Sequence, residues 1–222
     1  MKRRLLSFIA LLSFFNGYGQ LTSNYPASNF TIQQGTYTDL GTNGTVITTT
    51  GSDNSLSAAE PIGFTFTYNG TAYTDFTLST NGYIKLGTTP PSSASLVYAG
   101  PNSPTGGVFN STNAADQNIL VPFGFDLTGA TGAEYRVFTD GAPGSRTCTI
   151  QFKNLTENTS TIPTQYSNIN FQVILYETTN VIDFVYGPWT GTTNPSNAKW
   201  AFVGLRGTSN AANQIVSITK GS

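Results

Sequence analysis

The sequence of 222 residues contains no histidine, one cysteine and one methionine, and only 9% of its residues are charged. Without histidine, the chain cannot carry a Ser-His-Asp or Cys-His catalytic set, a histidine-ligated zinc ion or a histidine pH switch. The single cysteine excludes an internal disulfide and a cysteine-cluster metal site. Hydrophobic residues still make up 38% of the chain and aromatic residues 13%. The composition therefore indicates a folded domain with a packed core, rather than charged disorder or a coiled coil.

Residues 1–19 have the three parts of a secretory signal peptide. Three adjacent basic residues near the start precede an apolar run at 5–15, and Gly17 and Gly19 supply small residues before a cleavage site at residue 20. The apolar run is shorter than the roughly 20 residues that a membrane-spanning helix needs, and we find no other candidate span. We therefore expect a secreted or cell-surface protein with no transmembrane span, in which residues 20–222 form a single domain.

The basic residues that remain after removal of the signal are few and scattered. Seven stand against eleven acidic residues, with no basic stripe that could neutralise phosphates. This balance argues against nucleic acid as a partner. The lack of disulfides is untypical of small extracellular animal modules and fits a bacterial surface protein better. About 200 residues are enough to bury a core without covalent cross-links.

Short alternating stretches of apolar and polar residues recur along the chain, separated by Gly, Asn and Pro, whereas helical periodicity is nearly absent. Such spacing is typical of an all-β fold. We expect an antiparallel β-sandwich, jelly-roll-like, with long loops and little helix after the signal peptide. The polar stretches 88–118 and 156–168 are expected to be long loops, which either carry a binding surface or pack as flaps.

The first hairpin can be placed in register from its turn. Apolar residues alternate over 64–68 and are followed by Asn69-Gly70, the strongest short signal for a two-residue hairpin turn. This turn pairs Phe66 with Tyr73 and keeps aromatic side chains on one face of the sheet.

The next turn, at 80–82, is predicted to have a different length. A two-residue turn would place Lys85 opposite Leu78, on the apolar face. A three-residue loop with Gly82 in the left-handed conformation pairs Leu78 with Ile84 instead. A slip of one residue would expose the whole apolar set, so the three-residue loop is favoured.

Two later segments also alternate. The strands 171–175 and 182–186 are expected to share one apolar face if the loop between them has two or four residues. Their opposite face is only half apolar, and a loop could cover it. Alternation around Cys148 places the thiol in the core, where it is expected to be unreactive.

Four segments, in order, resemble nidogen-like (NIDO-like) domains: 61–87, with its hairpin and Ser-Thr-Asn-Gly turn; "ILVPFGFDL" at 119–127; a late hairpin at 170–187; and "AFVGLRGTSN" at 201–210. The resemblance implies a β-sandwich of the kind found in secreted and surface proteins of Bacteroidetes. Fibronectin type III modules and a type IX secretion sorting domain often follow such domains, so further downstream domains are expected if the chain is a piece of a longer protein. The family brings no established catalytic residues.

Aromatic residues on polar loops are the candidate ligand-binding side chains. Trp189, Tyr98 and Tyr166 lie among Gly, Pro, Ser, Thr and Asn, where a ring is harder to bury than in an alternating strand. Such rings could stack on sugars. The alternative for Trp189 is that its ring closes the end of the sandwich.

Carboxylates suggest two further possibilities. A sandwich-fold glycan hydrolase would need two facing carboxylates, for which Asp126 and Glu134, on either side of an expected turn at 128–132, are the candidates. Calcium could be bound by Asp126, Asp140 and Asp53, although the chain has no Asp-x-Asp-x-Asp-Gly series. Cofactors are otherwise not expected.

The interpretation that these observations favour is a non-enzymatic extracellular β-sandwich module for adhesion or ligand binding, with a glycan or a surface protein as partner. The alternatives are the glycan hydrolase with paired carboxylates and a purely structural spacer. The step from fold to function rests on analogy.

Overall fold

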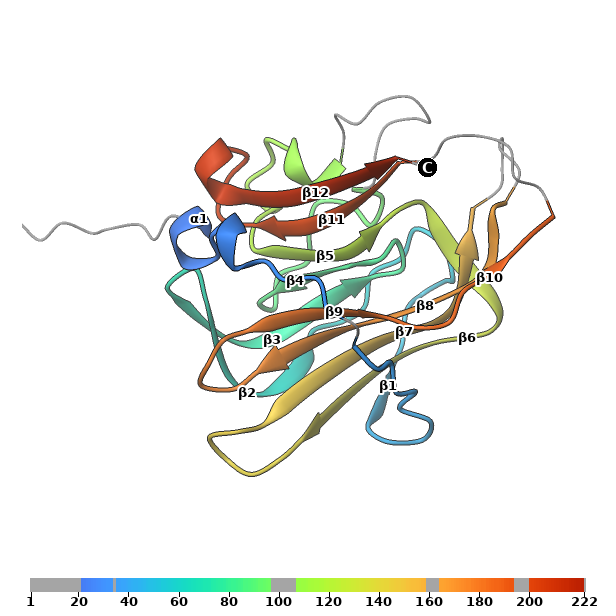
Figure 1. The fold of residues 1–222 in the computed structure, drawn as a ribbon, viewed down its shortest axis with the longest axis horizontal. Coiled ribbons are helices and arrows are strands. Elements are labelled where there is room, and N and C mark those ends of the chain that lie inside the picture. The colour runs from blue at the N-terminus through green and yellow to red at the C-terminus, as the bar shows by residue number, and fades with distance from the viewer. Residues whose placement is uncertain (1–20, 34, 97–106, 159–163, 194–199, 222) are drawn as a thin grey trace, which may run out of the picture.

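The structure is a computed structural model and describes residues 21–33, 35–96, 107–158, 164–193 and 200–221. Two antiparallel sheets of six strands each pack face to face (Figure 1). The predicted all-β antiparallel sandwich is therefore confirmed. The predicted signal peptide, 1–19, lies outside the described residues.

The first sheet has the order β1-β6-β7-β8-β10, and β9 also pairs with β8. Its strands are β1 (Thr45–Ile47), β6 (Leu127–Asp140), β7 (Thr147–Glu157), β8 (Tyr166–Tyr176), β9 (Ile182–Tyr186) and β10 (Thr190–Gly191). The second sheet has the order β12-β11-β5-β4-β3-β2. Its strands are β2 (Glu60–Tyr68), β3 (Thr71–Ser79), β4 (Tyr83–Leu86), β5 (Ile119–Gly124), β11 (Trp200–Arg206) and β12 (Ile215–Gly221). The short helices are α1 (Leu21–Asn24), η1 (Ala27–Asn29), η2 (Gly107–Phe109) and η3 (Ala212–Gln214).

Both predicted turns of the second sheet are confirmed. Phe66 pairs with Tyr73, and the two turn residues between β2 and β3, Asn69 and Gly70, have φ angles of 49° and 79°. Two positive φ angles in succession match the twist of a two-residue hairpin. At the next turn Leu78 pairs with Ile84, and the φ of 81° at Gly82 is the left-handed conformation that the three-residue loop requires.

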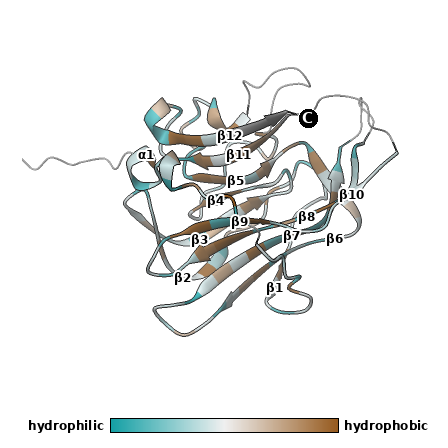
Figure 2. Ribbon diagram, in the orientation of Figure 1, coloured by the Kyte–Doolittle hydropathy of each residue, from teal (hydrophilic) through white to brown (hydrophobic). Residues whose placement is uncertain are grey.

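The core lies between the two sheets, where the inward faces of β7 and β8 are fully buried. Cys148, Ile150 and Phe152 contribute from β7, and Phe171 and Leu175 contribute from β8. Figure 2 shows that hydrophobic colour is concentrated in the strands, while the turns are hydrophilic. The core placement of the single cysteine is confirmed.

The strands β8 and β9 share a face as predicted. Leu175 pairs with Ile182 and Val173 with Phe184. The backbone N–H of Tyr176 donates to the carbonyl of Val181, which closes a loop of four residues. This is one of the two loop lengths that keep the apolar residues on one side.

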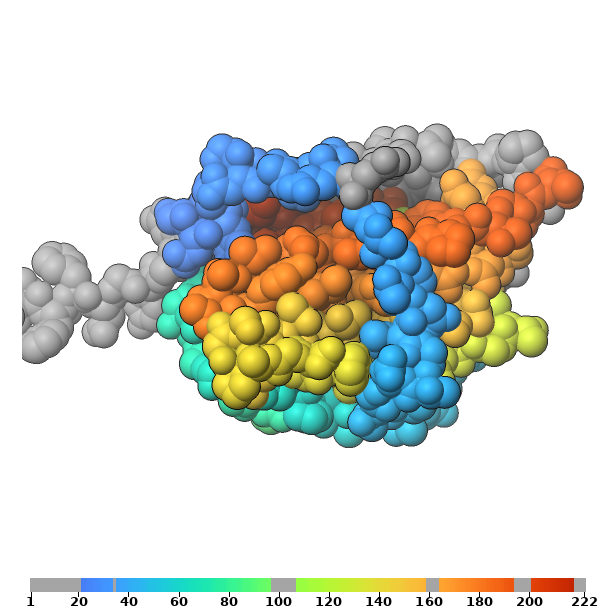
Figure 3. Space-filling view, turned by 60° about the horizontal axis from the view of Figure 1, so that its bottom comes forward, coloured from blue at the N-terminus to red at the C-terminus, as the bar shows by residue number. Residues whose placement is uncertain are grey.

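An N-terminal strap, defined here as residues 35–43, covers part of the outer face of β7 and β8. Figure 3 shows this blue segment crossing the orange strands. The side chain of Gln172 donates to the carbonyl of Thr38 at 2.8 Å and to Oε1 of Gln151 at 2.8 Å. The same Gln151 oxygen accepts from the backbone N–H of Leu40 at 3.0 Å. The strap thus satisfies two buried amides that would otherwise face solvent in a half-apolar surface.

The start of the chain is fastened to hairpins of both sheets. Asn24 donates to the side chain of Asn69 at 3.2 Å, and the ring of Tyr25 lies 5.4 Å from that of Tyr68. The Tyr25 hydroxyl donates to the carbonyl of Asn180 in the β8–β9 turn at 3.1 Å. Asn24, the last residue of α1, and Tyr25, which follows it, therefore link the β2–β3 turn to the β8–β9 turn.

Three charged side chains are buried between the outer face of the second sheet and the segment that connects β4 and β5. We call Lys85, Asp116 and Arg206 the buried charge cluster; their exposed fractions are 5%, 0% and 2%. Burial lowers the pKa of Lys85 and of Arg206, and the negative charge of Asp116 opposes both shifts. The carboxylate thus compensates two buried cations.

The buried charge cluster also holds the described parts of this connecting segment. Asp116 accepts from the backbone N–H and the hydroxyl of Ser92, both at 2.7 Å, and from the hydroxyl of Ser111. Lys85 donates to the carbonyl of Thr89 at 2.6 Å, and Arg206 donates to the carbonyl of Ser111 at 2.7 Å. These described parts are thereby fixed through charge-assisted hydrogen bonds, and Val108 and Phe109 also pack in a second apolar cluster with residues of the second sheet.

Two boundary predictions were wrong. The stretch 156–168 is not all loop, because β7 continues to Glu157 and β8 begins at Tyr166. The expected turn at 128–132 is an irregularity inside β6, where the pairing with β7 shifts register between Gly129 and Glu134. In both places pairing with a neighbouring strand overrides a composition that is typical of turns and loops.

Candidate functional site

Four aromatic side chains meet at one edge of the first sheet, where β9 and β10 both pair with β8. We call Phe123, Tyr166, Tyr186 and Trp189 the aromatic corner. The ring centroid of Trp189 lies 4.9 Å from that of Phe123, 5.1 Å from Tyr166 and 6.1 Å from Tyr186, in each case edge to face. The structure thus brings together Trp189 and Tyr166, two of the three predicted binding residues. The third, Tyr98, lies outside the described residues.

The orientation of Trp189 is fixed by a ring of three asparagines. The indole Nε1 donates to the carbonyl of Asn170 at 2.9 Å. The side chain of Asn170 donates to Asn168 and to the carbonyl of Pro188, the latter at 2.7 Å. Asn168 donates to Asn154 at 2.8 Å, and the backbone N–H of Asn154 returns to Asn170 at 2.9 Å. The closed set of hydrogen bonds holds the loop that carries the indole.

The aromatic corner is half buried rather than enclosed. Trp189 and Tyr166 are of intermediate exposure and pack against the core. Tyr186 is 42% exposed, and its hydroxyl donates to the carbonyl of Pro122 at 2.7 Å. Trp189 therefore both closes an edge of the sandwich and contributes to a partly exposed aromatic surface.

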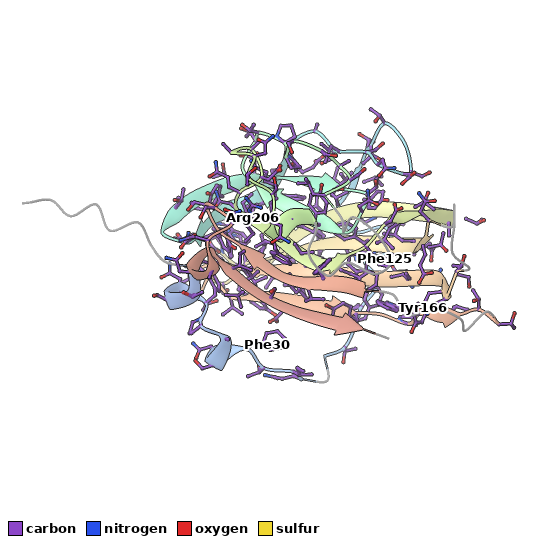
Figure 4. The ribbon with its side chains drawn as sticks, turned by 90° about the horizontal axis from the view of Figure 1, so that it is seen from above. Phe30, Phe125, Tyr166 and Arg206 are labelled. Carbon is purple, nitrogen blue, oxygen red and sulfur yellow. The ribbon has the colours of Figure 1, made fainter. Side chains whose placement is uncertain are left out.

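Figure 4 places Tyr166 and Phe125 toward one end of the molecule and Arg206 toward the other. The ring of Phe125 stacks on that of Phe123 at 6.0 Å. The aromatic corner and the segment around Phe125 therefore belong to one end of the sandwich, away from the buried charge cluster.

A pair of carboxylates, Asp53 and Asp126, lies next to this segment. The Nδ2 of Asn158 is 3.2 Å from Oδ2 of Asp53 and 3.4 Å from Oδ1 of Asp126, so one amide contacts both acids. An isolated bridge between Asp53 and Thr128 positions the first acid. Burial, and then the nearby charge of Asp53, raise the pKa of Asp126. Two of the three residues predicted as calcium ligands are thus neighbours.

The third predicted calcium ligand, Asp140, is not part of this pair. It is the last residue of β6, whereas Asp126 precedes the first residue of that strand. Its carboxylate accepts from the backbone N–H of Gly141 at 2.7 Å in the β6–β7 turn. The length of β6 therefore separates the two acids. Within the described ranges, no three His, Cys, Asp or Glu side chains are grouped as a metal site.

The carboxylate that was paired with Asp126 in the hydrolase hypothesis, Glu134, has a different partner. Arg136 donates to both of its oxygens, at 2.9 Å and 2.8 Å. This bidentate contact lowers the pKa of Glu134. A carboxyl group held ionised in this way is poorly suited to act as a general acid.

A shallow hollow of about 460 Å³ lies between β1 and the irregular part of β6. Ile47, Thr49, Ser52, Glu134 and Tyr135 are among its lining residues. The one carboxylate in this lining is Glu134, so the hollow does not present two facing acids. It borders the loop that carries Asp53, which follows Ser52 directly.

Several residues of these sites are not singled out by the sequence patterns. Phe123 and Tyr186 read as ordinary strand residues, and Asn158 lies in a stretch whose polar composition indicated a loop. Tyr135 carries no motif. Their roles arise from contacts between distant segments, for which the sequence offers no local signal.

One of three comparisons with known proteins identifies the family. The model of the NIDO-related family matches residues 28–222. No curated protein and no solved structure gave a significant match to the chain. Within the described residues, no helix has both the length and the apolar character needed to cross a membrane.

Proposed function

Because the chain belongs to the NIDO-related family, we propose that it is a non-enzymatic extracellular module that binds a glycan through the aromatic corner. The observation that carries the proposal is the partly exposed and fixed indole of Trp189, with Tyr166 and Tyr186 beside it. A protein of the cell surface is the alternative partner. The predicted signal peptide supports an extracellular location, which is part of the proposal.

The physical case for a glycan rests on the shape and chemistry of the aromatic corner. A sugar presents an apolar face of C–H groups, which matches the flat face of an aromatic ring. The hydrogen bond from Trp189 to Asn170 and the ring contacts with Phe123 and Tyr166 fix the ring before any ligand arrives. Binding then costs little side-chain entropy.

The experiment is a glycan array probed with the purified exported chain, followed by calorimetric titration of each glycan that binds. Trp189→Leu keeps an apolar side chain but removes the flat ring, and Tyr166→Leu tests the same surface from β8. We expect at least a tenfold loss of affinity in both variants. Tyr73→Leu is the matched control, because Tyr73 is also half buried against the core but lies on β3 of the other sheet.

Thermal unfolding of each variant separates lost binding from lost folding. If no glycan class binds, or if the two variants bind as tightly as the native chain, the proposal is wrong. Release of reducing ends from a bound glycan, abolished by Asp126→Asn in a folded variant, would support the hydrolase instead.

A further inference from the structure

The carboxylates of Asp53 and Asp126 are close neighbours of like charge. A single amide nitrogen, from Asn158, contacts both. None of the salt bridges in the described parts of the chain involves either acid. Two ionised carboxylates side by side repel each other, and the repulsion is relieved either by protonating one of them or by placing a cation between them.

A second observation concerns the buried side of this pair. Oδ1 of Asp53 is buried, and the described residues offer it no hydrogen-bond partner. The hydroxyl of Tyr135, a residue only 6% exposed, is likewise buried without a partner. Tyr135 lines the same hollow as Ser52, the residue that directly precedes Asp53, so the two groups lie in one region of the fold. Buried polar atoms in proteins almost always have a hydrogen-bond partner. Two such atoms in one region that do not bond each other indicate that a bound ion or water molecule contacts both.

We propose that Asp53, Asp126 and Asn158 bind a calcium ion. Nitrogen and oxygen of an asparagine amide are assigned from their surroundings, and a half-turn of the Asn158 amide exchanges them. After that turn, the carbonyl oxygen of Asn158 faces the two carboxylates, so that three oxygen ligands converge. The hydroxyl oxygen of Tyr135, which is buried and has no partner among the described residues, is proposed to approach the ion as well, and water would complete the coordination.

The ligand chemistry selects the kind of ion. Carboxylate, amide and hydroxyl oxygens suit hard cations, and calcium tolerates the irregular geometry of ligands from three separate segments better than magnesium does. Zinc and copper prefer histidine and cysteine ligands; histidine is absent from the chain and Cys148 is in the core. With two carboxylates, the affinity is expected in the range of extracellular modules, with Kd of about 0.1–1 mM.

The ion would bind three parts of the chain that backbone contacts already bring together: the N–H of Asn158 donates to the carbonyl of Asp126 at 2.9 Å, and Asp53 forms a bridge with Thr128. Asp53 lies in the loop after β1, Asp126 lies at the corner between β5 and β6, and Asn158 follows the end of β7. At 10 mM calcium and a Kd near 1 mM, binding to the folded state alone is expected to raise Tm by roughly 3–6 °C.

The test uses the purified exported chain, stripped with EDTA, dialysed and titrated with calcium chloride in a calorimeter and in thermal unfolding. We expect one ion per chain and the stated rise in Tm. Asp126→Asn and Asp53→Asn keep the size of each side chain and are each expected to abolish both effects. Without calcium, these variants should be at least as stable as the native chain, because the repulsion is removed. Asp140→Asn makes the same change of charge at the other end of β6 and should leave binding unchanged.

Three results would overturn the proposal. The first is no heat and no rise in Tm up to 10 mM calcium. The second is binding of calcium to Asp126→Asn as tight as to the native chain. The third is an equal rise in Tm with magnesium and in all three variants, which would indicate a general effect of ionic strength.

Discussion

The substitution Asp116→Asn tests whether the buried charge cluster stabilises the second sheet through charge. The asparagine keeps the shape of the side chain, and its oxygen can still accept from the backbone N–H of Ser92. Its amide faces the hydroxyls of Ser92 and Ser111, which can turn to accept. What is lost is the negative charge that faces Lys85 and Arg206.

The expected cost is substantial because both cations are buried, with exposed fractions of 5% and 2%. Removing one partner of a buried ion pair typically costs about 3–5 kcal/mol, since the remaining charge is left uncompensated. Asp116 acts on both cations through its charge, and none of the salt bridges among the described residues joins it to them, so we expect a smaller cost of about 2–3 kcal/mol. Proteins of this kind are stable by only about 5–15 kcal/mol. For a domain of this size, the loss corresponds to a fall in Tm of roughly 4–10 °C.

Urea unfolding followed by tryptophan fluorescence measures the change in the free energy of unfolding. Asp140→Asn is the control, because it removes an exposed charge in a turn and is expected to change stability by less than about 0.5 kcal/mol. Adding Lys85→Met to Asp116→Asn should recover at least about 1 kcal/mol, since one uncompensated cation disappears. A loss below about 1 kcal/mol in Asp116→Asn would refute the reasoning.

The remaining predictions concern one glycine, one ion pair and the thiol. Gly82→Ala should lower the free energy of unfolding in urea by more than about 3 kcal/mol, because the added Cβ would collide with the backbone carbonyl of Phe123 in β5. Gly70→Ala is the control: its φ is nearly the same but the space around it is open, so it should cost only about 1–2 kcal/mol. Equal costs of the two variants would contradict the argument. Arg146 lowers the pKa of Glu177 to about 2, below its unfolded value, so this ion pair stabilises the fold above pH ~4.5 and its contribution is lost as the pH falls toward 2. Glu177→Gln should therefore flatten the curve of unfolding free energy against pH between these two values. An unchanged slope in the variant would exclude the ion pair as the cause of this pH dependence. Burial raises the pKa of Cys148 to about 12, so Ellman's reagent at pH 8 should label the chain only in denaturant; labelling of the folded chain would show that the thiol is accessible.

The parts of the fold that could be predicted from the sequence are those set by neighbouring residues. Asn69-Gly70 fixes a hairpin locally, and the alternation on either side then determines which side chains face the core. The three-residue loop ending at Gly82 followed from the same argument, because a slip would have changed the faces of Leu78 and Lys85. Both registers are confirmed.

What could not be predicted depends on contacts between distant segments. The strap over Gln151 and Gln172 carries no pattern that assigns it to that surface. The loop predicted at 156–168 was too long because its polar residues belong to strands that pair with neighbours. Asp53, Asp126 and Asp140 were all predicted from the sequence as calcium ligands. Only the fold shows that Asp140 lies apart from the other two and that Asn158 contacts both Asp53 and Asp126.

The strap also has a mechanical consequence. Its nine residues are attached side-on, by side-chain amides and by the ion pair between Lys153 and Asp39, whereas each strand of the sheets is attached by a continuous ladder. Once the contacts of Asn24 and Tyr25 have yielded, tension applied at the N-terminal end would load these attachments one after another, as in peeling, so that each yields at low force. The released strap would span roughly 30 Å when fully extended, at about 3.4 Å per residue, before the load reaches β1. A domain tethered at that end would thus absorb the first stretch outside the sandwich, with both sheets and the aromatic corner still intact.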